Sequence, residues 1–330
     1  MYGYGDFSIS LDRRIKNAEI DFISHAHSDH ISAAKSSKNA LLSSATMELI
    51  NAAYGINVSS RRTEGIEGVR LISAGHILGS RQLVIEGNDG TGKTIYSGDF
   101  QMDKSSVSEP IEIEGAETLI IDSTYPHYGL RFDEREVIEN KIARWTVRKM
   151  EEGIVLFGAY AIGKAQELIS ILNRYGVRPV VSKKISRVNE VYKRHGIRLE
   201  YFSAFDGADH ESAVRGNFVG ITEKRISILK PILKRIHGKE VFSAVATGFS
   251  KLYNLGADAQ FDLSDHADFY QRIEYIERVA PRRIFTYGSN AKVLAANLVK
   301  AGYKASEYKE RYVPVRLPLE VSTSTPTVRG

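Results

Sequence analysis

Three histidines and one aspartate occur within six residues near the N-terminus, in the sequence His25-Ala26-His27-Ser28-Asp29-His30. Imidazole nitrogens and carboxylate oxygens bind zinc well, and the chain contains no cysteine that would offer a thiolate instead. Four such donors are more than one ion needs from a single segment, so the cluster predicts a centre with more than one metal ion. A polar loop that is rich in histidine by chance is the alternative, but this density of histidine is rarely structural.

The cluster follows the segment 20–24, which the sequence predicts to be a short strand. Residues two apart on extended backbone point to the same side, so His25 and His27 are expected to share one face. Similar positions recur further along the chain. His76 lies in a glycine-flanked loop after the strand predicted at 69–73, and Asp99 follows the strand predicted at 93–97.

Two more residues of this kind come later: Asp122 follows an apolar strand, and His266 lies in an acidic segment. An aspartate at the end of a strand most often caps a turn, so each position alone is a weak signal. Polar groups that follow neighbouring strands of one sheet, however, meet at one edge, where α/β proteins place their chemistry.

The pattern of predicted elements changes midway along the chain. The first part is rich in short strands, predicted at 40–44, 69–73, 81–86, 93–97 and 118–122, with a turn at 87–90. After a helix predicted at 132–152, strands at 154–157 and 179–181 alternate with helices at 164–175 and 183–195, which is typical of a parallel sheet. The remaining predictions are a basic helical segment at 222–236, strands at 241–246 and 283–287, helices at 268–279 and 291–301, and a frayed tail at 322–330.

Composition favours a cytoplasmic enzyme. The 330 residues are 42% hydrophobic, the mean hydropathy is −0.24, and no apolar run approaches the ~20 residues of a membrane span. The first residues also lack the basic and apolar regions of a signal peptide. The net charge of +5 permits a polyanionic partner but does not establish one.

Taken together, His25, His27, Asp29, His30, His76 and Asp99 resemble the ligand set of the metallo-β-lactamase fold, and Asp12 stands where that fold has an aspartate that supports the first loop. The segments 122–125 and 264–268 resemble motifs A and B of the β-CASP nucleases, closest to ligase-associated DNA exonucleases and archaeal relatives.

The resemblance implies an αββα sandwich with an inserted α/β β-CASP domain. The expected boundaries are a first core part at 1–140, the cap at 141–245, a return to the core at 246–316 and a tail at 317–330.

The resemblance also implies roles for these residues. His25, His27 and His76 would hold one zinc ion, Asp29 and His30 a second, and Asp99 would bridge the two; manganese is the alternative metal in vitro. His266 would contact the scissile phosphate and protonate the leaving oxygen, with Asp122 orienting it.

Motif C departs from the family pattern, because Tyr287 stands where many relatives have a metal-binding histidine. Tyr287 is expected to be a weak oxygen ligand, a hydrogen-bond donor to water, a stacking ring or a core-edge tyrosine without a chemical role.

A phosphate pocket is the second site hypothesis. Lys164 follows a glycine loop at the start of a predicted helix, and with Gly163 and Ser264 it is expected to bind a substrate phosphate. The alternative is that Lys164 caps a solvated helix. Basic residues of the insert that could line a groove for a nucleic-acid strand are Lys183, Lys184, Arg187, Lys224, Arg225, Lys230, Lys234 and Arg235.

The leading hypothesis is therefore a two-zinc nuclease that acts on DNA or RNA, on single strands or ends, with a DNA exonuclease in repair or end processing favoured over an RNA-processing enzyme. Repair or ligase-associated proteins are the expected partners. A thioesterase or lactonase of the same fold and a nucleic-acid-binding scaffold with a weakened metal site are the alternatives. Cleavage polarity, exonuclease or endonuclease action, and oligomeric state stay open.

Overall fold

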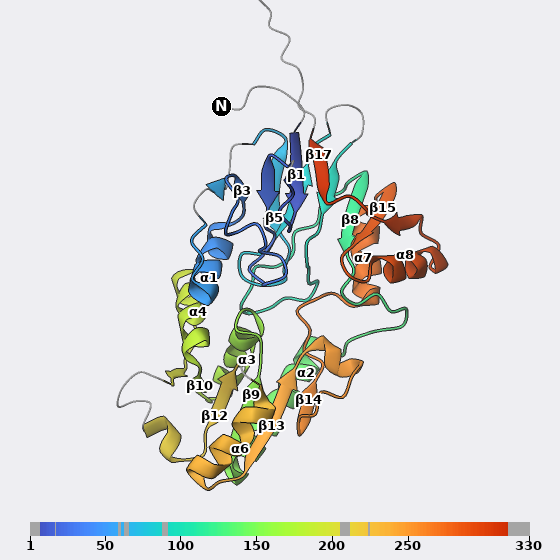
Figure 1. Cartoon of the computed structure of the whole chain (residues 1–330). Coiled ribbons are helices and arrows are strands. Elements are labelled where there is room, and N and C mark those ends of the chain that lie inside the picture. The colour runs from blue at the N-terminus through green and yellow to red at the C-terminus, as the bar shows by residue number, and fades with distance from the viewer. Residues whose placement is uncertain are drawn as a thin grey trace, which may run out of the picture.

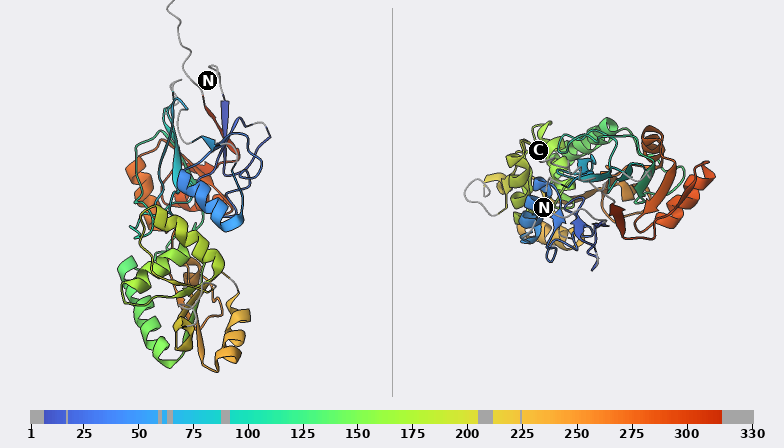
Figure 2. Two further views of the ribbon diagram at one scale, coloured as in Figure 1. Left: turned by 90° about the vertical axis from the view of Figure 1, so that its left-hand side faces the viewer. Right: turned by 90° about the horizontal axis from the view of Figure 1, so that it is seen from above.

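The computed structural model describes residues 7–16, 18–58, 61–62, 66–87, 92–204, 212–223 and 225–315. These residues form two lobes, shown from the front in Figure 1 and from the side and above in Figure 2. The first lobe contains segments from both ends of the described chain, and the second is built from its middle. Most of the turn predicted at 87–90 and the whole tail at 317–330 lie outside the described residues.

The first lobe contains two sheets that face each other. One has the spatial order β17 (Tyr312–Val315), β1 (Phe7–Leu11), β2 (Ile20–Phe22), β3 (Ala40–Leu41) and β4 (Arg61–Arg62). The other has the order β16 (Ala305–Glu307), β15 (Arg283–Tyr287), β8 (Thr118–Asp122), β7 (Thr94–Tyr96), β6 (Arg81–Ile85) and β5 (Val69–Ser73).

Strand β8 shows how this lobe is layered. Ile120 joins Ile9 and Phe22 of the facing sheet in one buried cluster, whereas Leu119 and Ile121 join a second cluster on the opposite side. Alternation along a strand sends successive side chains to opposite faces, so a strand buried on both sides must be apolar throughout.

Helices cover the outer faces of these sheets. The second cluster of β8 is closed by α7 (Phe269–Val279) and α8 (Ala291–Lys300), and α1 (Ser44–Tyr54) packs beside β3. The layers are therefore helix, sheet, sheet and helix, which confirms the expected αββα sandwich.

The second lobe is an α/β unit with a parallel sheet. Its strand order is β11 (Phe202–Ser203), β10 (Val180–Val181), β12 (Val219–Thr222), β9 (Ile154–Gly158), β13 (Val241–Ala246) and β14 (Ala259–Phe261). Its helices include α2 (Arg135–Glu152), α3 (Lys164–Asn173), α4 (Lys183–Arg194) and α6 (Ile226–His237), and a 3-10 helix, η1, spans Gly248–Lys251. We call this unit the cap.

Two features of the cap differ from expectation. The sheet continues to β14, beyond the boundary predicted at residue 245, so we propose that the cap ends after Phe261. The helix predicted at 222–236 begins only at Ile226, because Thr222 still pairs with Gly158 in the parallel sheet. Sheet pairing thus overrides the helical pattern at this point.

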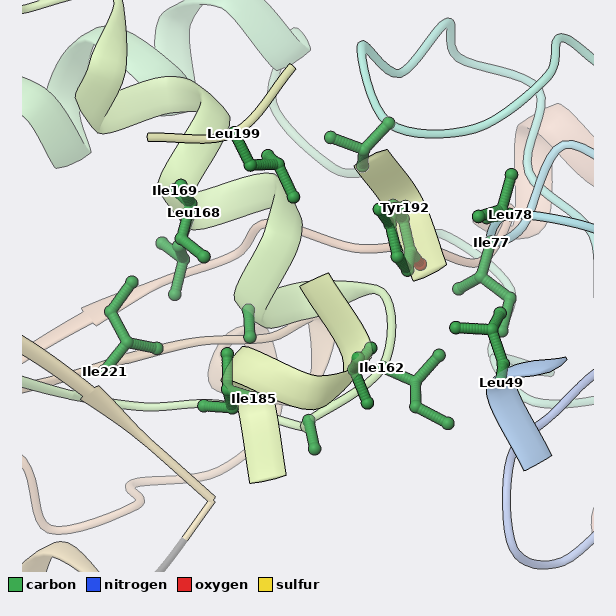
Figure 3. Close-up of a cluster of buried hydrophobic side chains, with 14 of the residues drawn as sticks. Leu49, Ile77, Leu78, Ile162, Leu168, Ile169, Ile185, Tyr192, Leu199 and Ile221 are labelled. Atoms are coloured by element: carbon green, nitrogen blue, oxygen red, sulfur yellow. The ribbon is translucent and has the colours of Figure 1, made fainter. Parts of the chain in front are cut away.

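A continuous apolar core joins the cap to the first lobe. Figure 3 shows Leu49 of α1 and Ile77 beside Ile162 and Tyr192 of the cap, all of them buried. An ion pair of 2.8 Å between Arg194 of α4 and Glu48 of α1 lies at the edge of this contact. Among the described residues no helix is long and apolar enough to cross a membrane.

Candidate metal centre and its cleft

Loops at one edge of the two sheets carry the predicted metal-binding residues. His25 and His27 follow β2, His76 lies between β5 and β6, and Asp99 follows β7. These loops pack closely: a Cβ atom on Gly98, whose φ is +53°, would lie 2.9 Å from a side-chain atom of Ser24. Glycine therefore lets the Asp99 loop approach the histidine loop.

Three imidazoles converge on one point. His25 Nε2 and His76 Nε2 each lie 3.1 Å from His27 Nδ1, and His25 Nε2 is 3.5 Å from Asp99 Oδ2. This arrangement brings His25 and His27, expected on one face, together with His76 from far along the chain. Four donor atoms gathered in this way form a group that can hold a metal ion.

The opposite ring nitrogens of the three histidines have hydrogen-bonding groups of their own. His25 Nδ1 lies 2.9 Å from Ser24 Oγ, His76 Nδ1 lies 2.7 Å from the Asp265 carbonyl, and His27 Nε2 lies 3.3 Å from the Ile162 carbonyl. A bond at the far nitrogen fixes the ring and leaves the near nitrogen free to bind a metal. The residues present therefore fit a metal ion.

His30 forms a second group beside the first. Its Nε2 lies 3.3 Å from Asp99 Oδ2 and 3.5 Å from Asp29 Oδ2, while its Nδ1 lies 3.0 Å from Asp12 Oδ2. Asp99 thus lies between His30 and the imidazole trio, and Asp12 supports His30 from behind. The Asp29 side chain is 77% exposed, which makes it the most open of the expected ligands.

Asp12 also fixes the loop that carries the histidines. Its carboxylate accepts hydrogen bonds from the Ser24 amide at 2.6 Å and the Tyr96 hydroxyl at 2.7 Å. Its backbone has φ +56°, a left-handed conformation that a non-glycine residue adopts at a cost of about 1–3 kcal/mol. These bonds offset that cost and hold Asp12 against His30.

Burial sets the charge of the imidazole trio. It lowers the pKa of His25 well below its ordinary value, lowers that of His27, and lowers the pKa of His76 to about 3. Neutral imidazole is the form that binds a metal ion, so these three rings are ready for one at neutral pH.

The surrounding carboxylates raise the pKa of His30, and His30 lowers the pKa of two of them. Burial alone would lower the pKa of His30, but Asp99 and Asp12 raise it well above its ordinary value. Burial would raise the pKa of Asp99, but His30 holds it well below the usual range. In the same way a hydrogen bond from His30 lowers the pKa of Asp29 to about 2. The pocket thus holds ionised carboxylates, as a cation site requires.

His266 faces the metal centre from the loop before α7. Its Nδ1 lies 3.9 Å from Asp99 Oδ2 and 3.9 Å from Asp122 Oδ2, too far for a hydrogen bond. This nitrogen is buried and has no hydrogen-bond partner among the described residues. An unpartnered buried polar atom aimed into a charged site is suited to bind a ligand.

Asp122 pairs with an arginine rather than directly with His266. Arg272 Nη2 donates to Asp122 Oδ2 at 2.7 Å, and its Nε and Nη1 donate to the carbonyls of Asp122 and Tyr125 at 2.9 and 2.8 Å. The Arg272 side chain is completely buried. Arg272 gives no signal in the sequence, because nothing in the pattern of helix α7 distinguishes it from a surface arginine.

Lys164 and Gly163 of the predicted phosphate pocket make contacts within the protein. Lys164 is 1% exposed, and its Nζ lies 2.9 Å from Glu167 Oε2 and 3.7 Å from Asp265 Oδ2. The Gly163 amide donates to the Gln166 side chain at 2.8 Å, so the helix start is already capped. These contacts argue against a phosphate site at Lys164 and Gly163.

Ser264 is likewise engaged within its own loop. Its hydroxyl accepts from the His266 amide at 3.0 Å and donates to the His266 carbonyl at 2.8 Å. The placement of Lys164, Gly163 and Ser264 argues for structural roles beneath the metal centre. Contacts within the same turns engage all three residues, and Asp265 adds a second carboxylate beside Lys164 from far along the chain.

Tyr287 lies at the edge of the site. Its hydroxyl donates to the Leu11 carbonyl at 3.1 Å, and its ring packs edge-on against Tyr96 with centroids 5.5 Å apart. Of the four alternatives, these contacts favour the core-edge tyrosine.

A cleft of about 1050 Å³ opens over the metal centre, between the first lobe and the cap. Charged residues from the site line its floor, and Arg13, Lys184 and Arg225 line its walls together with exposed aromatic rings. Of the basic residues expected in a groove, Lys230 and Lys234 instead pair with Asp258 and Glu240, and Lys224 lies outside the described residues.

Comparisons with known proteins place this geometry in a family. A protein of Opitutus terrae named "Probable DNA ligase" is 31% identical over 329 residues, which cover 94% of this chain but 30% of that protein. The chicken protein "5' exonuclease Apollo" is 28% identical over 186 residues, covering 52% of this chain and 39% of its own length. An "RNase J-like protein" of Methanocaldococcus jannaschii is 35% identical over 119 residues, covering 34% of this chain and 27% of its own.

No protein-family model matches the chain. The chain spans less than a third of the length of the ligase-named relative. The αββα sandwich, the converging histidines and aspartates and the parallel cap define a metallo-β-lactamase-fold protein with an inserted domain. The similarity to these relatives identifies the group within that fold: the chain belongs to the β-CASP family.

Proposed function

We propose that this protein is a metal-dependent phosphodiesterase that cleaves nucleic acid and holds two zinc ions per chain. The observation that carries the proposal is the unpartnered His266 Nδ1, 3.9 Å from Asp99, at the floor of a cleft lined by cations and rings. His25, His27 and His76 hold the first ion, Asp29 and His30 the second, and Asp99 lies between the two groups.

Bound zinc supplies a hydroxide nucleophile near neutral pH and positive charge for the phosphoryl oxygens. The chain's own residues do the rest. His266 contacts the phosphate and gives a proton to the leaving oxygen, a task for which an imidazole is suited. Asp122, held by Arg272, places its carboxylate oxygen Oδ2 3.9 Å from the His266 ring nitrogen Nδ1. Asp12 holds His30 in its orientation.

DNA is the proposed substrate, cleaved from an end during repair or end processing. The support is that similar proteins bear the names of a DNA ligase and a 5′ exonuclease. RNA is the second candidate, and the specific observation in its favour is the similarity to an RNase J-like protein. A ligase or other repair protein is the proposed partner.

One assay grid tests the proposal. The zinc-loaded protein is given end-labelled single- and double-stranded DNA and RNA, each with a 5′-phosphate or a 5′-hydroxyl, and products are followed over time. We expect cleavage of DNA by wild type and none by Asp99→Ala, with Glu109→Ala, an exposed carboxylate outside the site, as the matched control. Equal inactivity of wild type and Asp99→Ala on every substrate would contradict the proposal.

Zinc content separates the competing classes. Two ions per chain are expected by elemental analysis, and less than one would favour a nucleic-acid-binding scaffold. Hydrolysis of a thioester or lactone without cleavage of any nucleic acid would favour a small-molecule hydrolase.

A further inference from the structure

Aromatic rings extend in a line from the metal centre into the cleft. The ring centroids of His266 and Tyr125 are 5.8 Å apart, those of Tyr125 and Phe249 5.1 Å, and those of Phe249 and Tyr253 6.3 Å. Exposure rises along the line, from 1% at Tyr125 to 36% at Phe249 and 59% at Tyr253. The outer rings therefore present open surface to whatever occupies the cleft.

A further exposed ring, that of Tyr160, lies close to the predicted metal ligand His27. Tyr160 follows β9 in the loop that leads to Gly163, is 62% exposed and lines the cleft. Its ring centroid is 6.2 Å from that of the metal-site residue His27. Large exposed rings gathered in one cleft mark a binding surface more often than scattered ones do.

The turn that carries Phe249 is built to hold its position. A Cβ atom on Gly248 would lie 2.5 Å from the Tyr125 hydroxyl oxygen, so only glycine lets η1 pack this closely on Tyr125. The Thr247 side chain accepts from the Phe249 amide at 3.4 Å and caps η1. The ring is thus presented from an ordered turn.

The strand order of the cap sheet sets the order of the cationic and aromatic residues along one edge of the cleft. Its inner strands run in the order β10, β12, β9 and β13, and the residues that follow them are Lys184, Arg225, Tyr160 and Phe249. Cations therefore lie at one end of the cleft and rings at the other. Within the described part of the chain the Arg225 guanidinium has no ion pair or hydrogen bond, and the Lys184 ammonium lies 4.8 Å from the ring centroid of Tyr54.

We propose that Tyr160, Phe249 and Tyr253 form a platform on which unpaired nucleobases stack beside the phosphate held at the metal centre. Arg225 and Lys184 then bind backbone phosphates of the same strand. The ligand class is single-stranded nucleic acid, because bases in a duplex already stack on each other and cannot open onto these rings. The inference rests on the proposed function for the position of the scissile phosphate.

Equilibrium binding tests the platform independently of catalysis. The full chain in EDTA is titrated with a labelled oligothymidylate and, separately, with a backbone of the same length made of abasic residues. We expect Tyr160→Ala and Tyr253→Ala each to weaken binding of the oligothymidylate by about five- to a hundredfold, and to leave the abasic chain unaffected. Tyr253→Trp should restore the affinity, because tryptophan offers a larger ring.

Tyr128→Ala is the matched control, since Tyr128 is 65% exposed but does not line the cleft. Wild-type affinity of both tyrosine variants for the oligothymidylate would overturn the inference, and so would an equal loss for the abasic chain, which would indicate a general folding or charge effect.

Hydrolysis of bis(4-nitrophenyl) phosphate by zinc-loaded wild type distinguishes a failure of the stacking platform from a failure of the proposed function. This substrate has no base. If wild type hydrolyses it but base-dependent binding is missing, only the platform fails. If base-dependent binding is present but neither this substrate nor any nucleic acid is hydrolysed, only the proposed function fails.

Discussion

Replacing Arg272 by methionine tests how motif A is held. The side chain is completely buried, and its guanidinium makes one bond to the Asp122 carboxylate and two to backbone carbonyls. Methionine fills a similar volume without charge, so the change removes the three hydrogen bonds and leaves the Asp122 carboxylate without its cation.

The magnitude follows from this burial. Removing one partner of a buried ion pair costs about 3–5 kcal/mol, because the remaining charge loses its partner and stays out of water. Asp122 keeps hydrogen bonds from the Thr124 amide at 2.9 Å and hydroxyl at 2.7 Å, which places the expected loss at the lower end, about 3 kcal/mol. Because the two groups act together, Asp122→Asn combined with Arg272→Met should cost less than the sum of the single changes, by about 1–3 kcal/mol.

Urea unfolding of the four proteins, followed by circular dichroism, measures these values. Arg278→Met is the matched control on the same helix, since its side chain is 55% exposed and its contact with Glu274 is 3.5 Å. That change should cost less than about 0.5 kcal/mol. A similar small cost for Arg272→Met, or additive effects in the double variant, would refute the account of Arg272 as the residue that positions Asp122.

Three other predictions concern glycine, pH and metal. Gly163→Ala should lower the free energy of unfolding by about 1–3 kcal/mol, since φ is +84° and the new Cβ would lie 2.5 Å from Ile77 Cγ2, whereas Gly176→Ala, with open space around it, should cost only about 1 kcal/mol. Burial alone would raise the pKa of Asp258, but its hydrogen bonds and a lysine lower it to about 2. The stabilisation by the Asp258 carboxylate is therefore complete above the pKa of the unfolded chain and is lost on acidification. The difference in unfolding free energy between wild type and Asp258→Asn should shrink from pH 6 to pH 3, and a constant difference would contradict this prediction. EDTA should lower the melting temperature of wild type but not that of Asp99→Ala, measured by scanning calorimetry.

The candidate metal site is recognisable in the sequence because its signal is local. His25, His27 and His30 lie within six residues, and the chemistry of imidazole alone indicates zinc. Strands such as β5 and β8 were predictable for the same reason, since their apolar runs lie between turn signals. The short strand β14 was missed because Ala259 and Gln260 pair through backbone atoms that the side-chain pattern does not report.

Other features depend on where distant segments meet. Lys164 reads as a phosphate-binding residue from its neighbours, but the fold places Asp265, from far along the chain, 3.7 Å from its ammonium. The rings of Tyr160 and Phe249 gave no spacing signal, because only the parallel sheet brings the ends of β9 and β13 together. Tertiary pairing, rather than local pattern, decides such positions.

The grouped histidines and aspartates are proposed to bind metal ions that cleave nucleic acid. The most direct test is the rate of oligonucleotide cleavage as zinc is added stepwise to the metal-free protein, with bound zinc measured in each sample. We expect no cleavage by the metal-free chain and activity that appears as the second ion binds. Cleavage by the metal-free chain, or two bound ions without cleavage of any DNA or RNA, would contradict it.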